Sequence, residues 1–225
     1  ICEYLLAVSS VASGWSSYVQ GFLASLGIAL PKALTAGYNA KEGTYIDLIA
    51  ALVVVFITVW VTQEAKKALR LNNLMVWVKF ALIALFIVVG VFFIEPSNWK
   101  PYMPFGFSGV FDGAALVFFA FLGFDAIALA AEEVENPQKD IPRGIIGSIA
   151  IATVLYVIVT LILTGMVPYT ELGVGDPVAF ALRYVKLDMI GSVISIGAIF
   201  TLLTVTISML YSRVRLIYAT SQDGF

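Results

Sequence analysis

The chain has 225 residues, of which 60% are hydrophobic and 12% are charged, with a formal net charge of −2. A soluble surface normally needs about a quarter of the residues to be charged, so the 13 basic and 15 acidic residues exclude an ordinary soluble domain. The charge balance excludes nucleic-acid binding through a basic face. One cysteine and no histidine exclude a disulfide framework, a multi-cysteine or histidine-ligated metal site and a catalytic triad. We expect a polytopic membrane protein with no metal and no cofactor.

Six segments meet or approach the roughly 20 apolar residues that a membrane-spanning helix needs. They cover residues 4–29, 46–63, 74–94, 110–130, 144–167 and 189–211. No alternating strand pattern competes with them, so we predict an all-α fold in one membrane domain. Basic residues near the span ends place loops 64–73 and 131–143 in the cytoplasm. The chain starts at Ile1 and stops just after an apolar run, and we expect it to be an internal fragment.

The first predicted span carries a stripe of small residues at helical spacing, headed by an acidic residue. Small side chains on one face let helices approach closely in a bilayer, which favours a packing role for the stripe. Glu3, at its head, is interpreted either as an acidic partner in a proton path or as a carboxylate at the membrane interface. The stripe consists of Glu3, Ala7, Ser10, Gly14, Ser17 and Gly21.

Lys79 lies inside the third predicted span, roughly 9 Å along the helix from Asn73. A charged side chain at membrane depth costs several kcal/mol and indicates a functional site. Its ammonium group could take the place of a bound cation or lose its proton during transport. The alternative is that Lys79 reaches back to the cytoplasmic interface, which two helical turns nearly permit.

The fourth predicted span contains Gly123 and Asp125 near its middle, where a continuous helix favours neither. We predict a break near residues 119–123, with Asp125 capping the new helix. A break at this depth exposes carbonyl oxygens, which are tolerated only where they line a cavity and which suit an ammonium ligand. The alternative is an intact helix in which Asp125 pairs with a neighbouring span.

The sixth predicted span contains several hydroxyl side chains among its apolar residues. Thr201 and Thr204 are three residues apart and therefore share a helix face. They could offer oxygen atoms to a cation or to Lys79. The alternative is that these hydroxyls bond to the backbone of their own helix.

Two strings near the fourth span resemble those of a known family. Residues 118–125 read Phe-Phe-Ala-Phe-Leu-Gly-Phe-Asp, and residues 132–142 read Glu-Glu-Val-Glu-Asn-Pro-Gln-Lys-Asp-Ile-Pro. Together they closely resemble the amino acid–polyamine–organocation permeases, and above all the bacterial members of the cationic amino acid transporter branch. Lys79 after Asn72-Asn73 and the terminal Asp223-Gly224 add to the likeness. Gln222 departs from it, because many relatives carry Arg there.

The resemblance implies that the six spans are the family's third to eighth, about half of a twelve-span member. The fold would be part of a LeuT-type inverted repeat of five spans plus five. The family's first span, which binds the substrate carboxylate, is absent from this sequence. The fourth span here would be the family's broken helix. The resemblance places the substrate ammonium group at Phe119, Ala120, Leu122 and Gly123, with the Phe119 ring as a gate.

Proton coupling is the second role that the resemblance implies. Lys79 matches the family's intramembrane lysine, and Glu3 matches an acidic position that some members use for coupling. Asp125, Thr201 and Thr204 join them as coupling or structural candidates.

We therefore predict a secondary active transporter of L-amino acids, multi-pass in the plasma membrane (the inner membrane of the cell). It would work by alternating access as a proton symporter, with no nucleic-acid partner. The alternative is an uncoupled exchanger or facilitator of the same fold. An enzyme is disfavoured because no nucleophile–base pair is visible, and a channel because no repeated filter residues are visible.

Overall fold

The computed structural model describes the backbone of residues 2–28, 30–41, 43–121, 123, 134 and 136–222. It describes the side chains of the same residues except 2–5, 62–72 and 211–222. These ranges contain helices and turns, no β-strand, and two isolated β-bridges within residues 35–47. The prediction of an all-α protein is confirmed for this part of the chain.

The α-helices of the described residues include three stretches that are long and apolar enough to cross a membrane. In chain order the helices are α1 (Cys2–Ser25), α2 (Leu48–Gly90), α3 (Gly106–Phe118), α5 (Pro137–Met166), α6 (Pro177–Tyr184) and α7 (Asp188–Gln222). The three stretches are Asn73–Phe93, Pro137–Met166 and Asp188–Leu210. The shortest has 21 residues, enough to cross a hydrocarbon core of about 30 Å. The total of six spans stays a prediction.

Glycine ends α1 before the predicted boundary at residue 29. Gly27 adopts φ +81°, and its N–H donates to the Ala24 carbonyl while the N–H of Ile28 donates to the Leu23 carbonyl. This pair of bonds is the Schellman motif, which favours glycine at the left-handed position. The helix therefore stops at Ser25 although the apolar composition continues.

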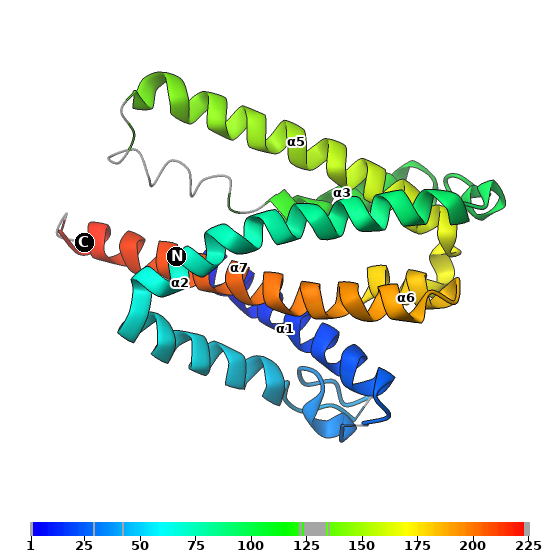
Figure 1. Cartoon of the computed structure of the whole chain (residues 1–225), viewed down its shortest axis with the longest axis horizontal. Coiled ribbons are helices and arrows are strands. Elements are labelled where there is room, and N and C mark those ends of the chain that lie inside the picture. The colour runs from blue at the N-terminus through cyan, green and yellow to red at the C-terminus, as the bar shows by residue number, and fades with distance from the viewer. Residues whose placement is uncertain are drawn as a thin grey trace.

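Two other helices extend beyond the apolar segments that predicted them. Helix α2 is continuous from Leu48 to Gly90. It therefore includes the basic stretch between the predicted spans 46–63 and 74–94, which we expected to connect two separate helices. Figure 1 shows α2 changing direction sharply between its first and last parts. Helix α5 begins at Pro137, because proline fits the first helical position, where no N–H bond is required.

The described segments lie at two opposite ends of the helices. In Figure 1 the start of α1, the bend of α2, the start of α5 and the end of α7 lie toward the left-hand end. The end of α1, the loop before α2, the end of α5 and α6 lie at the opposite end. This arrangement is the one that a bundle of membrane-crossing helices requires.

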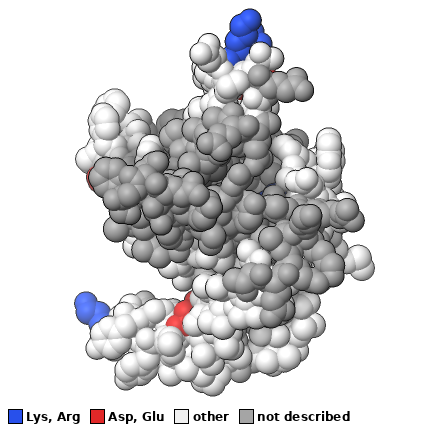
Figure 2. All heavy atoms as spheres, turned by 90° about the vertical axis from the view of Figure 1, so that its left-hand side faces the viewer, with Lys and Arg blue, Asp and Glu red and all other residues white. Residues whose placement is uncertain are grey.

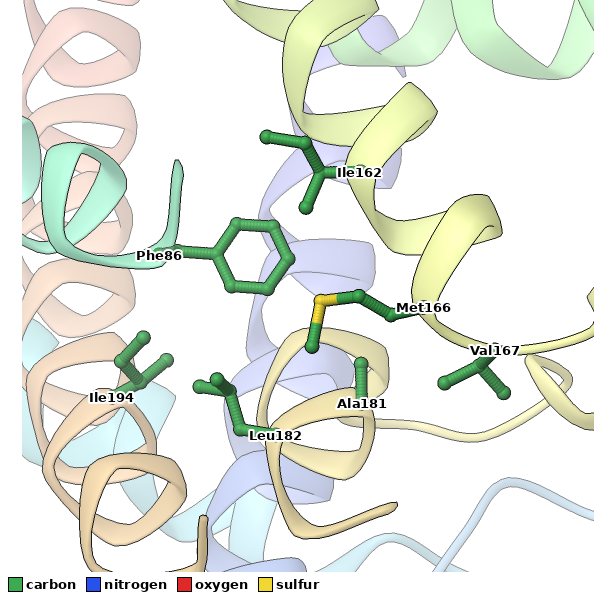
Figure 3. Packing of buried hydrophobic residues seen from close by; sticks show 7 residues of the cluster. All are labelled: Phe86, Ile162, Met166, Val167, Ala181, Leu182 and Ile194. Carbon is green, nitrogen blue, oxygen red and sulfur yellow. The ribbon is translucent and has the colours of Figure 1, made fainter. Parts of the chain in front are cut away.

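The buried core lies around α7, which packs against α1, α2 and α6. One cluster joins α2, α5, α6 and α7, and in Figure 3 its Phe86, Ile162 and Met166 side chains point toward one another. A second cluster joins α1, the first part of α2 and α7. Its buried members are Ala12, Ala50, Val53, Ile57 and Ile207.

The outer surface is as apolar as the core. Trp77, Leu116 and Ile146 are 77%, 78% and 70% exposed, and many other large apolar side chains are exposed as well. Water-soluble proteins rarely expose so much apolar surface. Among the described atoms in Figure 2 most are uncharged, with basic side chains at the top and at the lower left and an acidic one below the middle. An apolar exterior with charges at the ends of helices is that of a membrane protein.

Candidate functional site

A cavity of about 220 Å³ lies where α1, α2, α5, α6 and α7 meet. Its polar lining comes from Tyr18 of α1, Lys79 of α2 and Thr201 of α7. The remaining wall is apolar, formed by Leu82, Ile83, Phe86, Val159, Val178, Ile194 and Ala198. An apolar cavity with a few convergent polar groups is the usual form of a small-molecule site.

Helical spacing explains how the residues of α2 and α7 reach the cavity. The α2 residues are Lys79, Leu82, Ile83 and Phe86, at positions i, i+3, i+4 and i+7, which form one face of a helix. The α7 residues are Ile194, Ala198 and Thr201, at i, i+4 and i+7. Lys79 thus belongs to the face of α2 that packs inward, and its side chain is half-buried.

Gly197 of α7 lies against the Leu82 side chain of α2. A Cβ atom at Gly197 would come within 2.3 Å of Leu82 Cδ1, so only glycine fits there without a shift of the leucine. A small residue at a helix crossing lets two backbones come near each other in a membrane bundle. This approach brings Thr201 and Lys79 into the wall of the same cavity.

The hydroxyl groups of α7 bond to their own helix. Thr201 Oγ1 donates to the Ala198 carbonyl at 3.1 Å, and Thr204 Oγ1 donates to the Thr201 carbonyl at 2.8 Å. Both threonines are buried, but of the two only Thr201 lines the cavity. The Thr201 oxygen keeps lone pairs that can accept a hydrogen bond from a cavity ligand.

The middle of the predicted fourth span departs from α-helical geometry. Helix α3 ends at Phe118 and continues as a 3-10 turn, η4 (Phe119–Phe121). Gly123 then adopts φ +104°, a left-handed conformation that no right-handed helix contains. Leu122 and Asp125 lie outside the described residues, so the broken helix with its Asp125 cap stays a prediction.

The structure does not bring all the predicted site residues together. Lys79 and Thr201 share the cavity, whereas Phe119, Ala120 and Gly123 do not line it. Phe119 is 40% exposed. The side chain of Glu3 lies outside the described residues, so its relation to Lys79 is not tested.

Three aromatic residues to which the sequence analysis assigned no role make specific contacts. Tyr18 lines the cavity with Lys79. The Trp15 indole N–H donates to the Ile199 carbonyl of α7 at 2.8 Å, and the Tyr156 hydroxyl donates to the Ala120 carbonyl at 2.7 Å. Aromatic residues are common throughout the chain, so composition gave no signal that singled these out.

An ion pair near the C-terminal end of α1 was not predicted from the sequence. Asp176, at the start of α6, pairs with Arg183 two turns later on the same helix, and Asp176 is buried. The Asp-Pro pair at 176–177 is a typical helix start, and a spacing of seven residues places both charges on one face. These two features are the signal from which the sequence could have predicted the pair.

No group of three or more His, Cys, Asp or Glu side chains that could hold a metal ion occurs among the residues that the structure describes. The polar groups in the cavity are the ammonium group of Lys79, the phenol of Tyr18 and the hydroxyl of Thr201. They can exchange protons and hydrogen bonds with a ligand.

Comparisons with known proteins match almost the whole chain. The family described as Amino acid permease matches residues 5–225. The methylthioribose transporter of Bacillus subtilis (strain 168) is 50% identical over 222 residues, which are 99% of this chain and 48% of that protein. The branched-chain amino acid permease BcaP of the same organism is 47% identical over 227 residues, 100% of this chain and 49% of that protein.

More distant relatives include cationic amino acid transporter 4 of Homo sapiens, which is 31% identical over 229 residues, 100% of this chain and 36% of that protein. The chain thus spans about half the length of the first two relatives and less of the third. All three names are those of membrane carriers, which agrees with the prediction that the chain is no enzyme.

Proposed function

The chain belongs to the amino acid permease family, and from this premise we propose that it is part of a secondary active amino acid transporter. Transport would proceed by alternating access, driven by protons, in the plasma membrane. The observation that carries the proposal is the place of Lys79, a half-buried side chain that lines a mostly apolar cavity together with Tyr18 and Thr201. Ionisable side chains are rare at membrane depth and commonly mark the path of an ion or a proton.

The proposed architecture has six spans in this chain, as part of a LeuT-type inverted repeat. Three helical stretches of sufficient length and apolarity support it, together with the non-helical geometry at Gly123. In such folds an interrupted helix supplies carbonyl oxygens for the substrate. We assign this role to Phe119, Ala120, Leu122 and Gly123, and assign proton coupling to Lys79, Thr201 and, in the first span, Glu3.

Coupling requires that protonation of the site changes the relative stability of the outward and inward states. A ligand shifts such an equilibrium only by its difference in affinity for the two states. Protonated Lys79 has three donors in a cavity whose Thr201 and Tyr18 oxygens can accept, and neutral Lys79 loses charge and one donor. The stability of a conformation that brings these three groups together would therefore depend on whether Lys79 is protonated.

The substrate class is a proposal supported by the relatives. Two kinds of relative, the branched-chain amino acid permease BcaP and the cationic amino acid transporters, are named for amino acids. The uncharged, Phe-rich surroundings of residues 118–121 favour a small or apolar amino acid over arginine. Methylthioribose is the second candidate, because a relative named for it is 50% identical to this chain.

Uptake into proteoliposomes tests the proposal with the full-length protein. Labelled alanine, leucine, arginine and methylthioribose are compared, each with and without an inward proton gradient. Wild type should accumulate a small apolar amino acid when the gradient is present. Lys79→Ala should remove this accumulation, while the matched variant Lys139→Ala, at the exposed start of α5, should retain it.

Three results would contradict parts of the proposal. Uptake that does not change when the gradient is collapsed would indicate an uncoupled exchanger or facilitator, with Lys79 a fixed structural cation. Uptake of methylthioribose with no uptake of any amino acid would identify the second candidate. Normal gradient-driven uptake by Lys79→Ala would remove that residue from the coupling mechanism.

A further inference from the structure

A second pocket lies at the end of the molecule opposite the bend of α2, where the segment after α2 meets the ends of α5 and α6. Its volume is about 470 Å³, larger than that of the Lys79 cavity. Most of its wall is apolar, but it contains one acidic and one basic side chain, Glu95 and Lys186, both exposed. The proposed transport mechanism uses none of these groups.

The two charges of this pocket are available to a ligand. Among the residues that the structure describes, neither the Glu95 carboxylate nor the Lys186 ammonium group forms an ion pair or a hydrogen bond. Asn98 adds a third polar group, since its Nδ2 donates to the Gly165 carbonyl at 2.8 Å and its Oδ1 can still accept a hydrogen bond. Opposite charges that share a pocket without pairing suit a ligand that carries both signs.

The acidic side of the pocket is held firmly against α5. The backbone N–H of Glu95 and the side-chain amide of Asn98 both donate to the Gly165 carbonyl, at 2.9 and 2.8 Å. A Cβ atom at Gly165 would lie 2.9 Å from Ile94 Cγ2 and 3.2 Å from Trp99 Cζ2, so the 3-10 turn η3 (Pro96–Trp99) packs directly on α5. Little backbone ordering is therefore needed when a ligand binds there.

Lys186 occupies a backbone position that normally belongs to glycine. It has φ +64°, and its N–H donates to the Arg183 carbonyl while the N–H of Leu187 donates to the Leu182 carbonyl, both at 2.9 Å. These bonds form the Schellman motif that ends α6, whose left-handed position disfavours any residue with a Cβ atom. A lysine there offers what glycine cannot, a cation in the wall of the pocket.

The pocket lies at the depth of the membrane interface. Phe92 and Phe93, in its wall, end the stretch Asn73–Phe93 that is long and apolar enough to cross a membrane. Val88, Val91 and Phe92 are exposed at this end of the helix, so an apolar surface that can contact acyl chains leads up to the two charges. Phospholipid headgroups occupy the layer just outside the hydrocarbon core.

We propose that this pocket binds the headgroup of a zwitterionic phospholipid with a primary amine, such as phosphatidylethanolamine. The ammonium group of the lipid donates to the Glu95 carboxylate and to Asn98 Oδ1, and its phosphate accepts from Lys186. A primary ammonium group has three N–H donors, as in lysine, whereas the trimethylated group of phosphatidylcholine has none. The pocket therefore discriminates between two lipids of equal net charge. This inference is independent of which substrate the protein transports.

Lipid binding by the full-length protein in detergent tests the proposal. Phosphatidylethanolamine, phosphatidylcholine and phosphatidylglycerol with identical acyl chains are added separately, and the lipid retained is counted by native mass spectrometry. Melting temperatures are measured with and without each lipid. Free alanine is added in a parallel sample, because it too carries an ammonium group and an anionic group.

The first expected result concerns the amine. Wild type should retain phosphatidylethanolamine roughly tenfold better than phosphatidylcholine, as expected for the loss of a hydrogen bond to a charged group. Glu95→Gln should abolish this preference, because it keeps the shape of the side chain and removes its charge. Glu171→Gln, on an exposed turn that does not line the pocket, should keep the preference.

Lys186→Gly separates binding from folding. Glycine suits the left-handed position, so the melting temperature without lipid should equal that of wild type or exceed it. The same variant should bind phosphatidylethanolamine roughly tenfold more weakly, because the phosphate loses a charged donor. Lys41→Ala, an exposed lysine in the loop before α2 and outside the pocket, is the matched control and should bind as wild type does.

Several outcomes would overturn the inference. Equal retention of phosphatidylethanolamine and phosphatidylcholine by wild type, or an unchanged preference in Glu95→Gln, would show that the pocket does not recognise the amine. Stronger retention of phosphatidylglycerol would indicate a site for anions alone. Displacement of the lipid by free alanine would assign the pocket to an amino acid. A lower melting temperature of Lys186→Gly with unchanged lipid binding would give the lysine a purely structural role.

Discussion

Gly21 of α1 lies directly against the carboxylate of Asp176 at the start of α6. A Cβ atom at Gly21 would come within 2.5 Å of Asp176 Oδ2 and 3.0 Å of its Cγ. The same carboxylate pairs with Arg183, so it has little freedom to move aside. One turn before Gly21, Ser17 makes the equivalent contact with Gly175, where an added Cβ would lie 2.7 Å from Ser17 Cβ. The last two residues of the small-residue stripe, Ser17 and Gly21, thus pack against the segment that leads into α6.

Gly21→Ala should therefore destabilise the protein, by about 1–3 kcal/mol, as is usual for overpacking at a tight contact. Gly14→Ala is the matched control, because it lies on the same stripe and an added Cβ would meet nothing within 4 Å. Melting temperatures of the two full-length variants in detergent give the comparison. A melting temperature equal to that of Gly14→Ala would show that the contact is looser than described.

The Asp176–Arg183 pair should contribute measurably to stability. Arg183 Nη1 is already buried without a hydrogen-bond partner among the described residues, so losing Asp176 would leave the guanidinium still less satisfied. We expect Asp176→Asn to cost about 1–3 kcal/mol, the range for a hydrogen bond to a charged group.

Glu171→Gln, on an exposed turn nearby, controls for the change of charge in that measurement. A double-mutant cycle with Arg183→Met should give a coupling energy of similar size to the single loss. Additive effects of the two substitutions would mean that the pair is not formed in the membrane.

Trp15 joins α1 to α7 through a single hydrogen bond. Trp15→Phe removes the N–H that donates to the Ile199 carbonyl and should cost about 0.5–1.5 kcal/mol. Trp77→Phe, at a side chain that is 77% exposed, is the control for the loss of an indole. Thermal unfolding is again the readout, and equal effects of the two substitutions would count against the bond.

Thr201 should affect transport more than its buried neighbour Thr206. Thr201→Val removes the hydroxyl that Thr201 contributes to the cavity lined by Lys79, and we expect uptake in a proton gradient to fall roughly tenfold, equivalent to about 1.4 kcal/mol. Thr206 is buried and bonds to the Leu202 carbonyl of the same helix, so Thr206→Val should leave uptake within about twofold. Similar losses in both variants would indicate a general effect on α7.

Local chemistry made several features predictable from the sequence. The apolar runs predicted helices at α2, α5 and α7, because an unbroken apolar stretch of this length can satisfy its backbone in lipid only as a helix. A lysine within such a run is unusual enough to be singled out from the sequence as a functional candidate. The structure places Lys79 in the wall of a cavity, and its role in coupling stays a prediction. The boundaries were less predictable, since the Schellman motif at Gly27 and the continuous helix through residues 63–73 depend on backbone geometry and not on hydropathy.

Contacts between helices could not be read from the sequence in the same way. Tyr156 and Ala120 are 36 residues apart, and Trp15 and Ile199 are 184 apart. Neither pair has a spacing rule that relates its members, because they meet only after separate helices have packed. The threonines of α7 illustrate the difference: helical spacing placed Thr201 and Thr204 near each other, but the packing of α2 against α7 decided which of them reaches the cavity.

The sequence by itself determined the class of this protein, its family and the helical face that carries Lys79. Composition, hydropathy and spacing along one helix are local properties, and each follows from the chain without knowledge of its neighbours. Tertiary structure alone decided that Tyr18 and Thr201 surround Lys79, that Tyr156 holds the Ala120 carbonyl and that Gly21 abuts Asp176. Those relationships depend on how closely helix backbones approach, which is set by the summed shape of many side chains across each interface.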